Sequence, residues 1–161
     1  MQIEMVIKGL MVDPVTNMPI IVLRDRDGAR VLPIWVGVFE ANAIALQIEN
    51  VATPRPMTHD LLRNVIGDLN ARVQRIVVSD LRENTFYALI YLALGRDVVA
   101  VDARPSDAIA LALRVKAPIF VAEKVLDSAG HAEPKAKKET SDKWIDDLFD
   151  KLKPEDFKTE M

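Results

Sequence analysis

The chain has 161 residues, of which half are hydrophobic, so it is long enough to bury the core of one domain. It contains no cysteine, which excludes disulfide frameworks, thiolate zinc sites and thiol catalysis. The net charge of −3 lies entirely in residues 123–161, because residues 1–122 hold 13 basic and 13 acidic side chains. The apolar runs are too short for a transmembrane helix and the N-terminus lacks a signal-peptide pattern, so we expect a cytoplasmic protein without a membrane partner.

Most of the chain consists of short apolar segments separated by turn residues. Alternation of apolar and polar residues predicts strands, and apolar residues at helical spacing predict helices. Thr58 has the side chain of an N-cap residue and precedes one such helix. In chain order we predict strands at 5–13, 18–25 and 30–37, a helix at about 40–50, a helix at 58–70, strands at 73–81, 85–94 and 97–103, a helix at 105–115 and a strand at 119–122.

An internal duplication organises these elements. The pentapeptide NAIAL at 42–46 returns as DAIAL at 107–111, an offset of 65 residues. Each copy lies in a predicted helix that follows three predicted strands. We therefore predict an α+β fold of duplicated βββα units, with a mixed or antiparallel sheet covered by helices.

The C-terminal part of the chain differs in composition. We assign residues 1–126 to one domain and residues 127–141 to a polar, lysine-rich linker. Residues 142–161 contain an amphipathic stripe that includes Trp144, Leu148 and Phe149, which predicts a short helix followed by a tail. Because a lone short helix is marginal in water, we expect it to dock on its own domain or on a neighbouring subunit.

Three segments carry a resemblance to a known family. They are LPIWVGVFEANAIAL (32–46), RPMTHDLL (55–62) and DARPSDAIALALRVKAPIFV (102–121). Together they resemble the bifunctional nuclease domain over roughly residues 3–126. The resemblance implies a nuclease that hydrolyses phosphodiester bonds of both RNA and DNA, and it assigns no catalytic residues.

The chemistry of phosphodiester hydrolysis selects the candidate site residues. The reaction needs an activated water, a group that stabilises charge on the phosphoryl oxygens and a proton for the leaving oxygen. A histidine, carboxylates with a divalent ion such as Mg²⁺, and arginines can supply these functions. The catalytic candidates are Glu40, His59, Asp102 and Asp107, and the candidates for binding substrate are Arg55, Arg104 and Ser106. We expect these groups to converge where the two Arg-Pro segments meet the helix starts.

Structural roles are open for the same residues. Asp60 and Asp107 fall in first helical turns, where carboxylates cap backbone N–H groups and favour the helix dipole. His59 at a helix start is consistent with an ordinary surface histidine, and the arginines could simply pair with the equal number of acids. The sequence contains no HExxH motif and no glycine-rich phosphate loop.

Three alternatives are open for the function, namely a nuclease, a non-catalytic binding module and a purely structural repeat domain. The first is the nuclease, acting on RNA and DNA. The second is a non-catalytic oligomeric module that recognises an anionic ligand or a protein partner, because helix starts preceded by Arg-Pro could bind an anion without chemistry. Apolar residues such as Trp35, Phe39 and Phe86 exceed what one small core needs, so we expect a homo-oligomer, a dimer or higher.

Overall fold

Three antiparallel strands and a helix open the chain. The strands are β1 (Gln2–Val12), β2 (Pro19–Asp25) and β3 (Val31–Trp35), and helix α1 (Val38–Ile48) follows them. After helix α2 (Thr58–Asp68) the same order returns, with β4 (Ala71–Arg82), β5 (Thr85–Leu94), β6 (Asp97–Ala103) and helix α3 (Pro105–Val115). Strand β7 (Ile119–Ala122) and helix α4 (Glu123–Ala129) complete residues 1–129, the part that this computed structural model describes.

All seven strands form one mixed sheet in the order β3-β2-β1-β7-β4-β5-β6. The order is symmetric about β7, with β1–β3 on one side and β4–β6 on the other. Strand β7 is antiparallel to β1 and parallel to β4, so the two strand triplets run in opposite senses. This arrangement confirms the predicted α+β fold with a mixed sheet, and its two βββα halves meet at a strand that belongs to neither.

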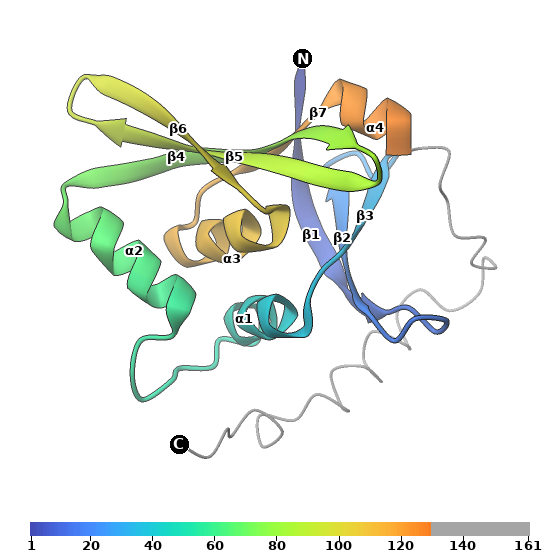
Figure 1. Cartoon of the computed structure of the whole chain (residues 1–161), viewed down its shortest axis with the longest axis horizontal. Coiled ribbons are helices and arrows are strands. Elements are labelled where there is room, and N and C mark those ends of the chain that lie inside the picture. Colours follow the sequence, from blue (N-terminus) through green and yellow to red (C-terminus); the bar gives the residue numbers. More distant parts are fainter. Residues whose placement is uncertain (130–161) are drawn as a thin grey trace.

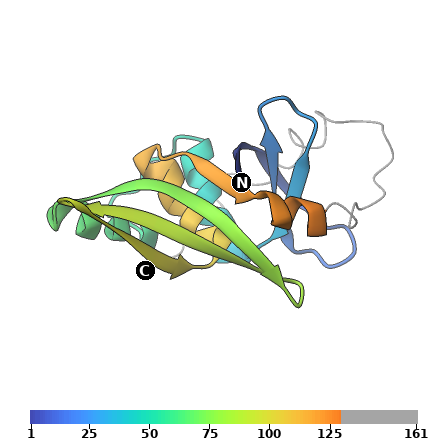
Figure 2. The ribbon, with the colours of Figure 1, turned by 90° about the horizontal axis from the view of Figure 1, so that it is seen from above.

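The two halves of the sheet cross one another, and the helices fill the angle between them. In Figure 1, β1–β3 run steeply past β4–β6, while α1, α2 and α3 lie together beneath the second triplet. The view from above in Figure 2 shows the same crossing, with β1–β3 standing up beside the long twisted ribbon of β4–β6. Helices α1 and α2 both pack against α3.

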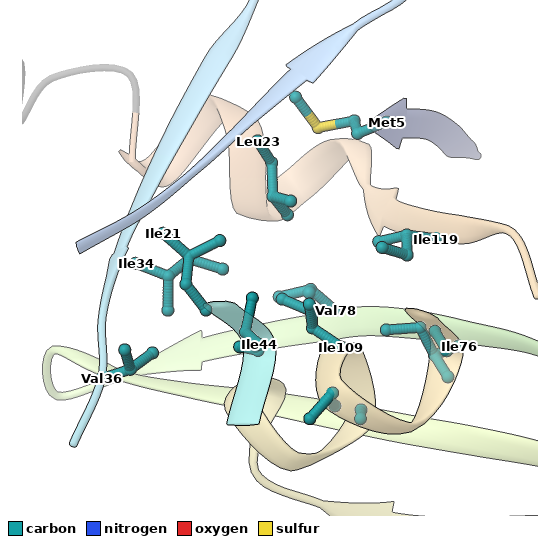
Figure 3. Close-up of a cluster of buried hydrophobic side chains, with 14 of the residues drawn as sticks. Met5, Ile21, Leu23, Ile34, Val36, Ile44, Ile76, Val78, Ile109 and Ile119 are labelled. Carbon is teal, nitrogen blue, oxygen red and sulfur yellow. The ribbon is translucent and has the colours of Figure 1, made fainter. Parts of the chain in front are cut away.

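The hydrophobic core lies where both triplets meet α1 and α3. Figure 3 shows Ile21 from β2, Ile44 from α1, Ile76 and Val78 from β4 and Ile109 from α3 pointing into one cluster. Ile44, Ile76 and Ile109 are completely buried. Helix α3 is buried along most of its length, because Ala108–Ala112 lie between the sheet and the other two helices. The repeated AIAL motif therefore supplies small and branched residues where helices approach closely.

The predicted boundaries hold for most elements. Four elements coincide with the prediction, namely β5, β6, β7 and α3, and the other predicted elements differ by at most three residues at either end. Strand β1 begins at Gln2 because Gln2–Met5 pair with β7, a partner more than 110 residues away that local patterning does not reveal.

Two details of the prediction are wrong. Thr58 is the first residue of α2 and not its N-cap, which is Met57 in extended conformation. Helix α4 was not predicted, and its last three residues, 127–129, fall in the segment assigned to the linker. It forms because Val125 and Leu126 are buried against the core. The remainder of the predicted linker and the predicted helix after residue 142 lie outside the described residues.

The helices are short. Within residues 1–129 none is long and apolar enough to cross a membrane.

Candidate functional site

The starts of the three longer helices are built from different local signals. Helix α3 begins at Pro105, which fits the first helical position, and the proline holds Arg104 before it in extended conformation. Helix α1 begins after Gly37, also extended, with Glu40 in its first turn. Helix α2 has Asp60 at its third position, where Oδ2 accepts a hydrogen bond of 2.9 Å from the Met57 backbone N–H. The predicted capping role of Asp60 is therefore confirmed.

Four of the candidate residues form one continuous hydrogen-bonded chain across these helix starts. Arg104 donates from Nη2 to Glu40 Oε1 at 2.7 Å and from Nε to Asp107 Oδ2 at 2.8 Å. The other carboxylate oxygen of Asp107, Oδ1, lies 2.8 Å from His59 Nε2. The chain Glu40–Arg104–Asp107–His59, called here the helix-start network, thus joins α1, α3 and α2. The expected convergence of these four side chains is present.

The charges in the network fix the proton positions. Although burial raises the pKa of Asp107, hydrogen bonds from Arg104 and His59 outweigh it and hold that pKa below its ordinary value. The carboxylates of Asp107 and Glu40 raise the pKa of the Arg104 guanidinium. Asp107 is therefore ionised at neutral pH and can only accept hydrogen bonds, so His59 donates from Nε2–H. In the neutral imidazole this leaves Nδ1 as an unprotonated, basic nitrogen.

Burial decides which members of the network can meet a ligand. The side chain of His59 is 10 % exposed and that of Asp107 30 %, whereas that of Arg104 is 64 % exposed. Arg104 uses two of its five N–H donors within the network, so the others face solvent. Asp107 is therefore the anchor of the network, and Arg104 presents a positive charge at the surface beside His59.

A second polar bridge between α2 and α3 was not predicted. Arg114 donates from Nε to Asp60 Oδ1 at 2.7 Å, and from its two terminal nitrogens to the backbone oxygens of Ala110 and Ala43. Its side chain is 2 % exposed. The signal was in the sequence, because Arg114 is seven residues after Asp107 and hence on the same face of the helix. We assign this bridge to packing, since it is buried and its donors are occupied.

Gly37 is a further residue that sequence reasoning missed. A Cβ atom at this position would collide with the carboxylate of Glu40, which folds back over the glycine. Glycine therefore gives Glu40 the space in which it meets Arg104. The sequence marked Gly37 only as the end of a strand.

The remaining candidates do not join the network. Asp102 is exposed on β6, opposite Leu89, and within residues 1–129 its side chain forms no hydrogen bond or ion pair. Ser106 is 6 % exposed and its hydroxyl forms no hydrogen bond in the same part of the chain. Arg55 is exposed in the loop before α2 and lines a different surface cavity, beside Arg63.

The clustered acids of a metal site are also not found in this region. Among residues 1–129 no group of three or more His, Asp or Glu side chains is placed to hold a metal ion. Within the network Arg104 already lies between the two carboxylates of Glu40 and Asp107. Mg²⁺ can also bind through one or two carboxylates together with substrate phosphates, and a nuclease assay with and without chelator tests for such binding.

Comparison with known proteins identifies the family of the chain. Residues 21–134 match the profile of the bifunctional nuclease domain. The chain is 41% identical over 163 residues to an uncharacterized protein of Mycobacterium tuberculosis, covering 96% of this chain and 98% of that protein. It is 32% identical over 105 residues to bifunctional nuclease 2 of Arabidopsis thaliana, covering 63% of this chain.

A rice relative extends the same match. Bifunctional nuclease 1 of Oryza sativa subsp. japonica is 28% identical over 114 residues, covering 68% of this chain. The match spans about a third of each plant protein, 34% of the rice one and 32% of the Arabidopsis one. The chain belongs to the bifunctional nuclease domain family.

Proposed function

We propose that this protein is a nuclease that hydrolyses phosphodiester bonds of RNA and DNA at the helix-start network. The observation that carries the proposal is the shared carboxylate of Asp107, with His59 on one oxygen and Arg104 on the other. The proposed base and the proposed phosphate-binding cation thereby share one carboxylate. Membership of the bifunctional nuclease domain family supports the same activity.

The proposed step uses water as the nucleophile, because DNA has no 2′-hydroxyl group. His59 Nδ1 takes a proton from water while the water oxygen forms a bond to phosphorus. The bond from phosphorus to the leaving oxygen breaks, that oxygen takes a proton from solvent, and His59 then releases its proton to solvent. Asp107 holds the imidazole in the tautomer with Nδ1 free and stabilises the imidazolium that forms.

Arg104 supplies the electrostatic part of the proposed mechanism. The negative charge on the phosphoryl oxygens is greatest in the transition state, and a fixed guanidinium beside it lowers the barrier. Glu40 and Asp107 each accept one hydrogen bond from Arg104, so the guanidinium is oriented before substrate arrives. Glu40 is thus a positioning residue in this scheme.

The decisive variant is His59→Gln. Glutamine can still donate a hydrogen bond to Asp107 but has no basic nitrogen, so it keeps the contact between helices and removes the base. We expect kcat on single-stranded RNA and DNA to fall by about 10²- to 10⁴-fold, the usual contribution of a general base. The melting temperature should stay near that of the wild type. Each assay is run with and without chelator on protein free of contaminating nucleases.

A matched control is Asp60→Asn, which weakens the other bridge between α2 and α3. Asp60 follows His59 in the chain, but its side chain is not part of the network, since it accepts from Arg114 and from the Met57 backbone. Folded Asp60→Asn protein should keep its activity while losing stability. If His59→Gln cleaves as fast as the wild type, the catalytic assignment is wrong.

A second candidate function is the non-catalytic module that binds an anion. The burial of His59, which is 8 % exposed, favours a supporting role for its ring over contact with substrate. In that case Arg104→Gln abolishes binding of a phosphate-bearing ligand, while neither the wild type nor His59→Gln cleaves nucleic acid above the buffer rate.

We also propose that the protein is a homo-oligomer. Phe39 is 87 % exposed and Val38 66 % exposed at the start of α1, and Trp35 is 40 % exposed beside them in the chain. Phe86, by contrast, packs against the core. Large exposed apolar residues that lie close together are typical of subunit contacts. Sedimentation equilibrium should show a dimer or larger species, and a monomer for Phe39→Ser.

A further inference from the structure

Two surface cavities adjoin α2, and their walls are rich in cationic side chains. One cavity, of about 330 Å³, is bounded by the loop before α2 and includes Arg55, Arg63 and Gln47 in its lining. The other, of about 340 Å³, lies where the end of α2 meets β4 and the end of α3, and includes Arg63, Arg72 and Lys116. Arg63 borders both cavities, so the two are neighbours along α2.

Five cations line these cavities, and only Arg114 is paired with an acid in the described part of the chain. Among the described residues, Arg55, Arg63, Arg72 and Lys116 take part in no ion pair. One acid, Asp60, lines the cavities, and it already accepts from Arg114. The expectation that arginines simply pair with acids therefore fails here. We name Arg55, Arg63, Arg72 and Lys116 the cation track.

The position and chemistry of the track indicate a phosphate ligand. Asp60, in the wall of the first cavity, follows His59 directly in the chain, although no member of the helix-start network lines either cavity. Neither lining contains an aromatic residue on which a base could stack. Charge without stacking surface fits the sugar–phosphate backbone of nucleic acid, not its bases.

We propose that the cation track binds consecutive phosphates of one polynucleotide strand and leads that strand past His59. The path of the strand past His59 rests on the proposed nuclease function, whereas binding of the strand does not depend on cleavage. Because phosphates are common to RNA and DNA, the track binds both with similar affinity and without sequence preference. The four cations come from segments up to 61 residues apart, which is why the sequence shows no basic stripe.

The test is the salt dependence of strand binding, measured by fluorescence anisotropy. The full chain carrying His59→Gln is titrated onto a labelled single-stranded oligonucleotide. Four phosphate contacts give a slope of log K against log salt of about −2.8, at about −0.7 for each contact. Arg63→Gln and Arg72→Gln should each make the slope less steep by about 0.7, and each should weaken binding roughly fivefold to tenfold at 50 mM salt.

The matched control is Arg96→Gln, which makes the same change of charge. Arg96 is exposed in the turn between β5 and β6, borders neither cavity and is in no ion pair of the described region. Its loss should leave the slope unchanged. If Arg96→Gln weakens binding as much as Arg63→Gln does, the binding is a general effect of charge and the track is wrong.

Competition distinguishes a strand from a single phosphate. Inorganic phosphate and a trinucleotide should displace the labelled strand far less well than an unlabelled strand of the same length, and equal displacement would overturn the track. Binding that depends on the track without any cleavage by the wild type supports this inference and refutes the proposed nuclease. Cleavage by the wild type with a KM that is unchanged in Arg63→Gln and Arg72→Gln supports the proposed nuclease and refutes the cation track.

Discussion

Replacement of Asp60 by asparagine tests how strongly the buried bridge holds α2 on α3. Its partner Arg114 has a side chain that is 2 % exposed, and the asparagine amide would place a donor against the N–H of either Arg114 or Met57, because Asp60 accepts from both. Removal of one partner of a buried ion pair costs about 3 to 5 kcal/mol. Arg114 keeps its bonds to the Ala110 and Ala43 oxygens, so we expect the lower end, about 3 kcal/mol.

The measurement is urea unfolding at pH 7 and constant protein concentration, with Asp80→Asn as the control. Asp80 pairs with Arg82 and Lys124, but the side chains of these cations are 67 % and 65 % exposed, and exposed pairs contribute little to stability. Asp60→Asn should therefore shift the unfolding midpoint clearly further than Asp80→Asn, with an unchanged slope. Equal shifts in the two variants would refute the view that burial makes the Asp60–Arg114 bridge important.

Two further predictions concern the helix-start network. Gly37→Ala should raise the KM for nucleic acid, because the added Cβ displaces Glu40 and frees Arg104, and steady-state kinetics beside the wild type measures this. The pKa of Asp107 is lowered in the folded state, so its stabilisation is fully present above the unfolded pKa of about 3.9 and is lost as pH falls through the folded value. The stability deficit of Asp107→Asn should thus be present at pH 7 and gone in strong acid, and a deficit that persists there contradicts this account.

Local pattern was sufficient for most secondary structure because each element carries its own boundary signals. Helix α3 was bounded by Pro105 and by the Ala-Pro pair at 117–118, and turn residues enclosed β5 and β6. The order of the strands in the sheet could not be predicted from local pattern. That β7 lies at the centre of the sheet depends on long-range pairing with both β1 and β4, which leaves no local mark on a four-residue strand.

The duplication and the chemistry of the side chains were enough to predict that four residues from three helix starts come together. Glu40 and Arg104 lie at equivalent helix starts, and these meet, as expected, through a bond between residues 64 positions apart. His59 lies outside the repeat, yet its ring reaches Asp107 because α2 packs on α3.

The errors of the site prediction have a common cause. Asp102 is two residues before Arg104, and nearness in sequence was taken as nearness in space. On strand β6 the Asp102 side chain is exposed opposite Leu89 and forms no contact with the network in the described part of the chain. Arg55 shares the Arg-Pro dipeptide with Arg104, but its backbone precedes the helix by more residues, and it lines a cavity that includes Asp60 and no member of the network.

The duplication itself provides the last prediction, because Asn42 occupies the position of Asp107 in the first half of the fold. Its Oδ1 atom is buried without a hydrogen-bond partner among the described residues, whereas both oxygens of Asp107 are bonded. An unmet buried acceptor costs about 1 to 3 kcal/mol, and alanine favours a helix over asparagine by about half a kcal/mol.

Asn42→Ala should therefore be neutral or stabilising by about 1 kcal/mol, after the loss of some packing. Asp107→Ala should destabilise, since it leaves Arg104 and His59 without their shared acceptor. Urea unfolding of the two variants makes the comparison. The same change at equivalent positions thus has opposite signs if Asp107 takes part in the network and Asn42 does not, and a comparable loss of stability in both variants would show that Asn42 has a structural role of its own.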